Sequence, residues 1–243
     1  MNRYPFQYMQ SSPSNRLNLI FDADDTLWDS NIHFLEAFDS FVDAILGAGC
    51  VVERKAIHNA VRQAELKLIE THGYGRRPYI IALHQAVRAI APVQAEQPIH
   101  DEIDRIGELL IERHCELLPD VEPTVHELAT RHQLILFTKG QRDEQLLKLE
   151  RSGLAPLFSR VETPREKDVH AYRRLIDEAE LDPAASYMIG NSPRSDINPA
   201  VRAGLRAVYI PHPHTWDLEH EEIDSGDERI IELPSFRRLA ELF

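Results

Sequence analysis

The positions of the strand patterns along the chain restrict its possible folds more than any other feature. One short apolar run, residues 17–21, is followed by helical pattern from 31 to 118 before another strand pattern occurs. A single strand forms no sheet, so residues 17–21 must pair with strands after residue 119. There, short β-rich runs alternate with helical ones, which predicts right-handed βαβ units and a parallel sheet in one α/β domain. These runs lie at 134–138, 158–162, 187–190, 205–210 and 230–233.

Residues 31–118 carry four apolar stripes whose members recur every three or four positions, as on one face of a helix. We therefore predict four helices inserted into the α/β domain, with breaks near 47–50, 73–75 and 91–98. The stripes are formed by Leu35, Phe38, Val42 and Ile45; by Ile57, Val61, Ala64 and Leu68; by Ile80, Leu83, Val87 and Ile90; and by Ile103, Ile106, Leu110 and Leu117. The predicted division is an N-terminal tail at 1–15, a core at 16–30 and 119–243, and a helical cap at 31–118.

Composition excludes several classes of protein. The 243 residues are 43% hydrophobic, which suffices for one core and an appended subdomain. Cys50 and Cys115 are too few to frame a secreted fold, and no segment has the apolar length of a signal peptide or a membrane span. We therefore predict a cytoplasmic protein without a membrane partner. The net charge of −13 argues against a nucleic-acid partner, since binding phosphate backbones requires a basic surface. Oligomeric state is not predicted.

Two carboxylates, Asp22 and Asp24, directly follow the first strand pattern. Two like charges about 4 Å apart repel by about 4 kcal/mol at an effective dielectric constant near 20, so such a pair is rarely kept for stability alone. An ionised nucleophile beside a carboxyl group pushed toward its protonated form would give a nucleophile and a general acid. Alone, Asp22 could equally be a turn former or a helix N-cap.

Further polar groups follow the other predicted strands. Thr138, Lys139 and Gly140 offer a hydroxyl, an amine and an unhindered backbone N–H, which suit phosphate oxygens. Because ligands bind at the carboxyl ends of parallel strands, these groups are expected to meet the two acids. Taken alone, Thr138 is typical of a strand and a lysine of a solvated surface. The remaining strand-end groups are Lys167, Asn191, Ser192 and Asp196.

The order and spacing of these groups resemble the four motifs of the haloacid dehalogenase superfamily, in its phosphatase-like branch with a helical cap after the first motif. The matching positions are Asp22-Ala23-Asp24-Asp25-Thr26, then Thr138, then Lys167, then Gly190-Asn191-Ser192 with Asp196. The resemblance implies a Rossmann-like core, a mobile cap over the site, and Mg²⁺-dependent chemistry through an aspartyl-phosphate.

The resemblance also implies a role for each position. Asp22 would attack phosphorus, and Asp24 would protonate the leaving alcohol and then deprotonate water. Thr138 would hold phosphate oxygens and Lys167 would add a cation. Mg²⁺ would be bound by Asp22, the backbone carbonyl of Asp24 and Asp196. Many members have an acid where this chain has Asn191; its amide oxygen can still act as a ligand, with weaker affinity.

The second acid favours phosphate esters over the dehalogenase and phosphonate-hydrolase reactions of related proteins, because a departing halide needs no proton. The sequence therefore predicts a Mg²⁺-dependent phosphatase acting on a small phosphorylated metabolite. A phosphomutase would keep the same pair of acids. A noncatalytic binding protein on this fold is the other alternative, motivated by Asn191 and by the His-containing segment after Ile210.

Two other segments have competing interpretations. Residues 211–221 alternate His with carboxylates, as in a transition-metal site, but a surface excursion is favoured because no second ligand cluster completes the set. Residues 73–77 form a turn with two arginines, which we interpret as a solvated loop rather than a substrate contact. Asp25 and Thr26 are expected to shape the turn after the first strand, and Leu27 and Trp28 to pack where the cap begins.

Overall fold

The computed structural model describes residues 16–112 and 116–243, so the predicted tail at 1–15 lies outside the described residues. Six strands form one parallel sheet in the order β3-β2-β1-β4-β5-β6. The first strand lies between β2 and β4, which come more than a hundred positions later in the chain, as its isolation in the sequence required. The strands are β1 Asn18–Phe21, β2 Gln133–Phe137, β3 Arg160–Glu162, β4 Ser186–Gly190, β5 Arg206–Tyr209 and β6 Ile230–Glu232.

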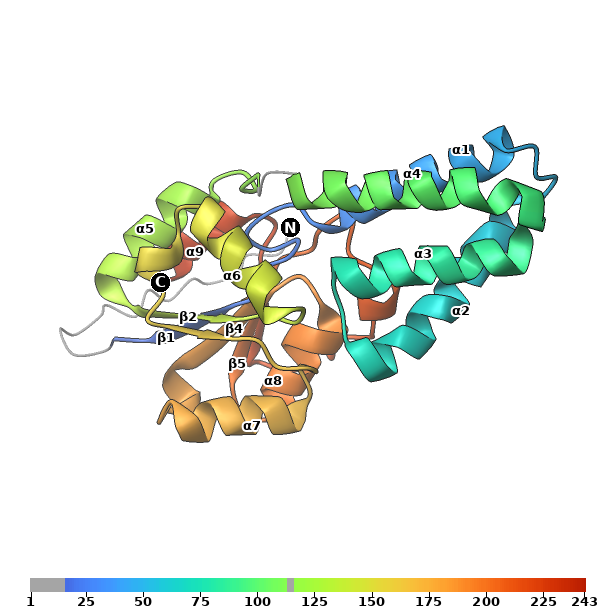
Figure 1. Cartoon of the computed structure of the whole chain (residues 1–243). Coiled ribbons are helices and arrows are strands. Elements are labelled where there is room, and N and C mark those ends of the chain that lie inside the picture. The colour runs from blue at the N-terminus through green and yellow to red at the C-terminus, as the bar shows by residue number, and fades with distance from the viewer. Residues whose placement is uncertain (1–15, 113–115) are drawn as a thin grey trace, which may run out of the picture.

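Helices cover both faces of this sheet (Figure 1). Since side chains alternate along a strand, Leu19 and Phe21 pack against α5, α6 and α9, whereas Ile20 packs against α7 and α8. Such two-sided burial explains why the strands are continuous apolar runs. The helices are α5 Val121–Arg131, α6 Arg142–Arg151, α7 Val169–Glu178, α8 Asn198–Arg202 and α9 Leu239–Leu242. Short helical turns span Ala155–Leu157, Pro183–Ala185, Pro193–Ile197, Asp217–Glu219 and Phe236–Arg238. The predicted fold class, a Rossmann-like α/β fold, is confirmed.

Four further helices, called the cap below, extend to one side of the sheet (Figure 1). They are α1 Asn31–Gly47, α2 Arg54–His72, α3 Arg76–Ile90 and α4 Val93–Glu112. Helix α3 contacts α2 and α4, and α1 contacts α4. Their buried faces form a hydrophobic cluster separate from those of the sheet, and it includes Phe41, Ile57, Leu83 and Ile103.

The structure corrects two details of the predicted fourth cap helix. The helix begins at Val93, directly after Pro92, and Pro98 lies inside it rather than in a break. Pro98 lies only in the second turn, where it removes one backbone hydrogen bond from a helix of 20 residues. Leu117, predicted on this helix, lies beyond its end at Glu112 and opposite Trp28.

The two connections between core and cap run side by side. The backbone N–H of Asp29 donates to the Glu116 carbonyl over 3.2 Å, and that of Leu118 donates to the Leu27 carbonyl over 3.0 Å. Trp28 and Leu117 form an antiparallel bridge between these bonds. Leu27 and Trp28 are fully buried in the core cluster, which confirms that they pack where the cap begins. Among the described helices, none is both long enough and apolar enough to cross a membrane.

Replacement of Ile103 by Ala tests whether the cap core stabilises the protein. Ile103 is fully buried on α4, so its truncation should lower the free energy of unfolding by about 2–5 kcal/mol. Leu109→Ala on the same helix is the control, because Leu109 is 44% exposed and its loss should cost less than about 1 kcal/mol. Denaturant unfolding measures both variants, and equal losses would contradict the packing described.

Candidate functional site

A cavity of about 690 Å³ lies at the carboxyl ends of the central strands and is bounded on its other side by the cap. Its core wall includes Asp22, Asp24, Thr138, Lys167 and Asp196, which follow β1, β2, β3 and β4. Strands adjacent in a parallel sheet end at the same edge, so groups far apart in sequence meet there. The structure thus brings together the side chains predicted to form the site.

Lys167 lies between two buried carboxylates. Its Nζ donates to Asp22 Oδ1 over 2.6 Å and forms an ion pair with Asp196 Oδ1. Burial raises the pKa of Asp22 and of Asp196, while the Lys167 ammonium acts to lower both. Burial also acts to lower the pKa of Lys167, but the two carboxylates outweigh it and raise that pKa. Two carboxylates and one ammonium leave an excess of negative charge when all three are ionised.

Asp196 can reach this position because residue 190 is a glycine. A Cβ on Gly190 would overlap the Asp196 carboxylate. The other carboxylate oxygen, Oδ2, accepts the backbone N–H of Ser192 over 2.9 Å. The segment after β4 therefore folds back under its own strand end and fixes the acid beside Lys167.

Asp24 accepts three side-chain hydrogen bonds. Trp28 Nε1 and Lys148 Nζ donate to its Oδ1 over 2.8 and 2.7 Å, and Gln145 Nε2 donates to Oδ2 over 2.8 Å. Burial acts to raise the pKa of Asp24, but Lys148 and the other donors outweigh it, so this pKa lies below its usual value. The expectation that Asp24 is pushed toward its protonated form is therefore wrong for this arrangement, because its neighbours favour the carboxylate.

Gln145 and Lys148 were missed by the sequence analysis. They lie one turn apart on α6, the helix after β2, and their spacing places both on one helix face. That spacing was a usable signal, but nothing in the sequence showed that this face points toward Asp24.

Thr138 is buried at the end of β2, and Gly140 adopts a φ of +115°, which favours glycine. Lys139 lines the cavity but already has partners there, and its role in holding phosphate stays a prediction. Its Nζ forms an ion pair with Glu219 Oε1 at 2.6 Å and donates to Ser195 Oγ over 2.9 Å. The ammonium also lies 4.1 Å from the centre of the Tyr74 ring. A nearby carboxylate thus already neutralises the charge of Lys139.

Asn191 presents its amide oxygen to the site. Its Nδ2 donates to Thr215 Oγ1 over 2.9 Å, and its Oδ1 accepts from Thr26 Oγ1 over 3.1 Å. The Thr26 hydroxyl also lies 3.3 Å from Asp22 Oδ2, so its single proton can serve either acceptor. Asp22, Asp196 and Asn191 therefore offer oxygen ligands, the type that Mg²⁺ prefers.

The segment after β5 is a surface excursion only in part. Pro211, His220 and Glu221 are exposed as predicted, whereas residues 213–219 line the cavity. Thr215 is buried, and the Trp216 ring meets the Tyr74 ring of the cap edge-on, with centroids 6.1 Å apart. Glu219 Oε2 accepts from Ser192 Oγ over 2.5 Å. Charge composition suggested exposure, but these acids and hydroxyls find partners at the strand ends.

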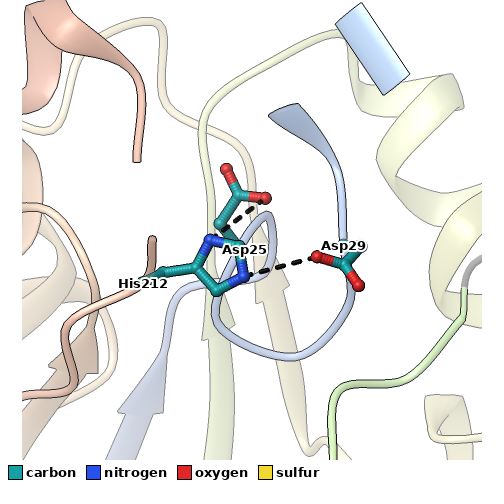
Figure 2. A group of neighbouring side chains, drawn as sticks. All are labelled: Asp25, Asp29 and His212. Atoms are coloured by element: carbon teal, nitrogen blue, oxygen red, sulfur yellow. Dashed lines mark ion pairs between the residues drawn. The ribbon is translucent and has the colours of Figure 1, made fainter. Parts of the chain in front are cut away.

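The same segment brings His212 between two acids of the turn after β1, as Figure 2 shows. His212 Nε2 lies 3.3 Å from Asp29 Oδ1, and Nδ1 lies 3.9 Å from Asp25 Oδ1. Ligand atoms of the three residues all lie within 4.8 Å of one another, so this group could hold a metal ion. The sequence analysis found no ligands to complete such a set, because Asp25 and Asp29 are far from His212 along the chain.

Asp25 shapes the turn into α1, as predicted. Its Oδ1 accepts the backbone N–H groups of Ser30 and Asn31 over 2.9 and 3.0 Å. Burial raises the pKa of Asp25 to about 6, although these two hydrogen bonds act to lower it. The carboxylate thereby satisfies backbone donors at the start of the cap.

The turn at residues 73–77 contacts the core, which corrects its interpretation as a solvated loop. Arg76 Nη2 lies 3.4 Å from Glu144 Oε1, and Arg77 Nη2 lies 2.5 Å from Asp143 Oδ2. Tyr74 OH donates to Glu166 Oε2 over 3.2 Å. The acids at the start of α6 therefore bind the cationic start of α3, and the turn closes one side of the cavity.

The strand order and the polar groups at the strand ends define a Rossmann-like α/β enzyme with a capped cavity. A family model of haloacid dehalogenase-like hydrolases matches residues 18–204, and the chain belongs to this family. The predicted membership of the haloacid dehalogenase superfamily is thus confirmed.

Several known proteins are similar to this chain. A phosphoserine phosphatase of Thermus thermophilus is 33% identical over 104 residues, which are 40% of this chain and 42% of that protein. The match therefore spans less than half the length of this relative. A haloacid dehalogenase-like family hydrolase from Xanthomonas campestris has 28% identity and a TM-score of 0.80, covering 96% of this chain and 92% of that one. A 2-haloacid dehalogenase from Pseudomonas syringae shares the fold at 20% identity and a TM-score of 0.63, covering 93% and 97%.

Removal of the Lys167 charge should destabilise the protein, because Asp22 and Asp196 would then repel each other without a cation between them. In Lys167→Met, Asp22 and Asp196 would lose their shared cation, and the free energy of unfolding at about pH 9, where the carboxyl groups are ionised, should fall by about 3–5 kcal/mol. Loss of the cation raises both folded-state pKa values further above their unfolded values. The deficit should therefore be largest above the folded-state pKa values of the variant and shrink as the pH falls through them toward the wild-type value, about 7 for Asp22.

Denaturant unfolding between about pH 9 and about pH 6 measures this effect. Lys148→Met is the control, because Lys148 and Asp24 each keep about 30% of the side-chain surface exposed and should contribute about 1 kcal/mol or less as a pair. A deficit for Lys167→Met that does not change with pH would refute the electrostatic account.

Proposed function

We propose that this protein is a Mg²⁺-dependent phosphatase that hydrolyses a small phosphorylated metabolite through an aspartyl-phosphate on Asp22. The observation that carries the proposal is the buried group of Asp22, Lys167 and Asp196 beside a second acid, Asp24, in the wall of one cavity. The phosphoserine phosphatase relative supports a phosphate ester as the substrate. A capped cavity of about 690 Å³ has the size of a small-molecule site. We therefore infer that the substrate is a small anionic metabolite rather than a polymer or a membrane lipid.

Asp22 is the nucleophile in this proposal. A nucleophilic carboxylate must be ionised, and Lys167 favours that form although burial opposes it. Lys167 at Oδ1 and Thr26 near Oδ2 hold the carboxylate in one orientation, which supports attack on a phosphorus atom at a fixed position. Bond formation from Asp22 to phosphorus breaks the ester bond and releases the alcohol.

Asp24 carries the proton in both half-reactions. It donates a proton to the leaving alkoxide and later takes one from the water that attacks the aspartyl-phosphate. Its lowered pKa suits the second step. The first step requires the protonated form, which the negative charge of a bound phosphate favours. Gln145 and Trp28 orient the carboxyl group for both transfers.

Mg²⁺ would be held by Asp22, Asp196, the Asn191 amide oxygen and the backbone carbonyl of Asp24. All of these are oxygen donors, whereas the group of Asp25, Asp29 and His212 includes an imidazole, which suits transition metals better. When bound, the ion supplies positive charge that offsets repulsion between phosphate and nucleophile. The excess negative charge of the Lys167 group favours uptake of such a cation.

The presence of Asp24 beside Asp22 favours phosphate esters over halogenated acids as substrates. A halide leaves without a proton, so a positioned proton donor has no use in dehalogenation. An alkoxide is a poor leaving group and gains most from protonation. Thr138 and Lys167 would hold the phosphate oxygens with backbone N–H groups such as that of Gly140. Lys139 would contribute less directly, because Glu219 neutralises it.

Asp22→Asn tests the nucleophile. With an aryl phosphate and Mg²⁺, we expect kcat to fall at least about a thousandfold, since the amide cannot form the acyl phosphate. Asp177→Asn, on the exposed face of α7, should keep the wild-type rate. Equal rates for Asp22→Asn and the wild type would exclude the mechanism.

Asp24→Asn tests the general acid. We expect kcat/KM for an alkyl phosphate to fall by about 10²–10⁴, and the loss for 4-nitrophenyl phosphate to be smaller, because nitrophenoxide leaves without protonation. Steady-state kinetics on both substrates give the comparison. A loss of the same size for both leaving groups would remove the acid role of Asp24.

A further inference from the structure

Glu65 presents an unpaired carboxylate to the cavity from the cap. It lies on α2, is partly buried, and lines the same cavity as Asp22. Its oxygens form neither a hydrogen bond nor an ion pair with any residue within 16–112 or 116–243. Burial raises the pKa of Glu65 to about 7, although the charge of Arg62 acts to lower it.

The cap wall of the cavity carries several apolar side chains, together with His33, His58 and Arg62. Along the cap wall, Phe34, Phe38, Val61, Leu66 and Ile69 line the cavity with Glu65. The Tyr79 hydroxyl is nearby but donates to the Phe34 carbonyl over 3.3 Å. Arg62, one turn earlier on α2, forms no ion pair of 4.0 Å or less with Glu65 in the described structure. The cap wall thus carries an acid that its own neighbours leave unsatisfied.

An unpaired, partly buried carboxylate costs free energy, and a group entering the cavity can recover that cost. An ammonium ion does so most fully, because it provides both a positive charge and N–H donors. The aromatic rings of Phe34, Phe38 and Tyr79 on the same wall also favour a cation. A substrate that reaches from Asp22 to the cap can place such a group there.

We propose that Glu65 binds an ammonium group on the alcohol part of the substrate, so that the preferred substrates are phosphate esters of amino alcohols. The inference rests on the proposed phosphatase function and names the class of leaving group. Glu65 is a specificity residue in this proposal, whereas Asp22 and Asp24 carry out the chemistry.

A series of substrates tests the proposal. Full-length protein with Mg²⁺ is assayed on ω-aminoalkyl phosphates with chains of different lengths, each beside the alkyl phosphate in which a methyl group replaces the ammonium. At the chain length that fits, the wild type should prefer the amine by at least about tenfold in kcat/KM, the size of one charged hydrogen bond. The preference should appear as a lower KM for the amine with an unchanged kcat, because the ammonium contact lies away from the reacting phosphorus.

Two variants test whether the preference for the amine depends on the negative charge of Glu65. Glu65→Gln should abolish the preference by lowering kcat/KM for the amines and not for the alkyl phosphates. Arg62→Gln, on the same helix and cavity wall, removes the opposite charge and should preserve or increase the preference. No preference at any chain length, or a preference that survives in Glu65→Gln, overturns the proposal.

Binding measurements separate this inference from the proposed function. Calorimetric titration of the Asp22→Asn variant with the best aminoalkyl phosphate and its methyl analogue requires no turnover. Tighter binding of the amine, lost when Glu65→Gln is added, supports the ammonium site even if no phosphate ester is hydrolysed. Hydrolysis of both substrates with equal efficiency retains the phosphatase and rejects the ammonium site.

Discussion

The contact of Lys167 with Asp22 and Asp196 is the interaction on which the organisation of the site depends. The three residues follow three different strands, β3, β1 and β4, and are fully or almost fully buried. Without the ammonium, two carboxylates would share a low-dielectric space, which is strongly unfavourable. The parallel sheet makes the contact possible because it brings the three strand ends to one edge, and Gly190 allows the final approach of Asp196.

The interactions predictable from sequence are those that follow from topology. Once β1 was assigned to a parallel sheet with the later strands, the convergence of Asp22, Thr138, Lys167 and Asp196 followed from their positions after strands. The strand runs were readable because both sheet faces are buried, so Leu19, Ile20 and Phe21 are apolar without interruption. The prediction for Leu117 was wrong because a partly buried apolar residue in an extended linker can continue the spacing of a helical stripe.

The sequence analysis missed the interactions between side chains that only the three-dimensional packing of helices and loops brings together. Lys148 on α6 and Glu219 after β5 are charged residues of ordinary appearance in the sequence, yet each pairs with a group of the site. These pairs favour the ionised form of Asp24 and neutralise the charge of Lys139, and the sequence alone could show neither effect. His212 is a third case, since its contact with Asp29 depends on how the segment after β5 folds back.

The paired linkers at Trp28 and Leu117 have a mechanical consequence. A subdomain held by two separate tethers can slide, tilt and twist with respect to its partner. Here both crossings of the chain are joined to each other by backbone hydrogen bonds, so they behave as a single narrow strip. A displacement of the cap that keeps these hydrogen bonds would be a swing about that strip. The contacts between α3 and α6 lie at the cavity rim, where such a swing would separate them first.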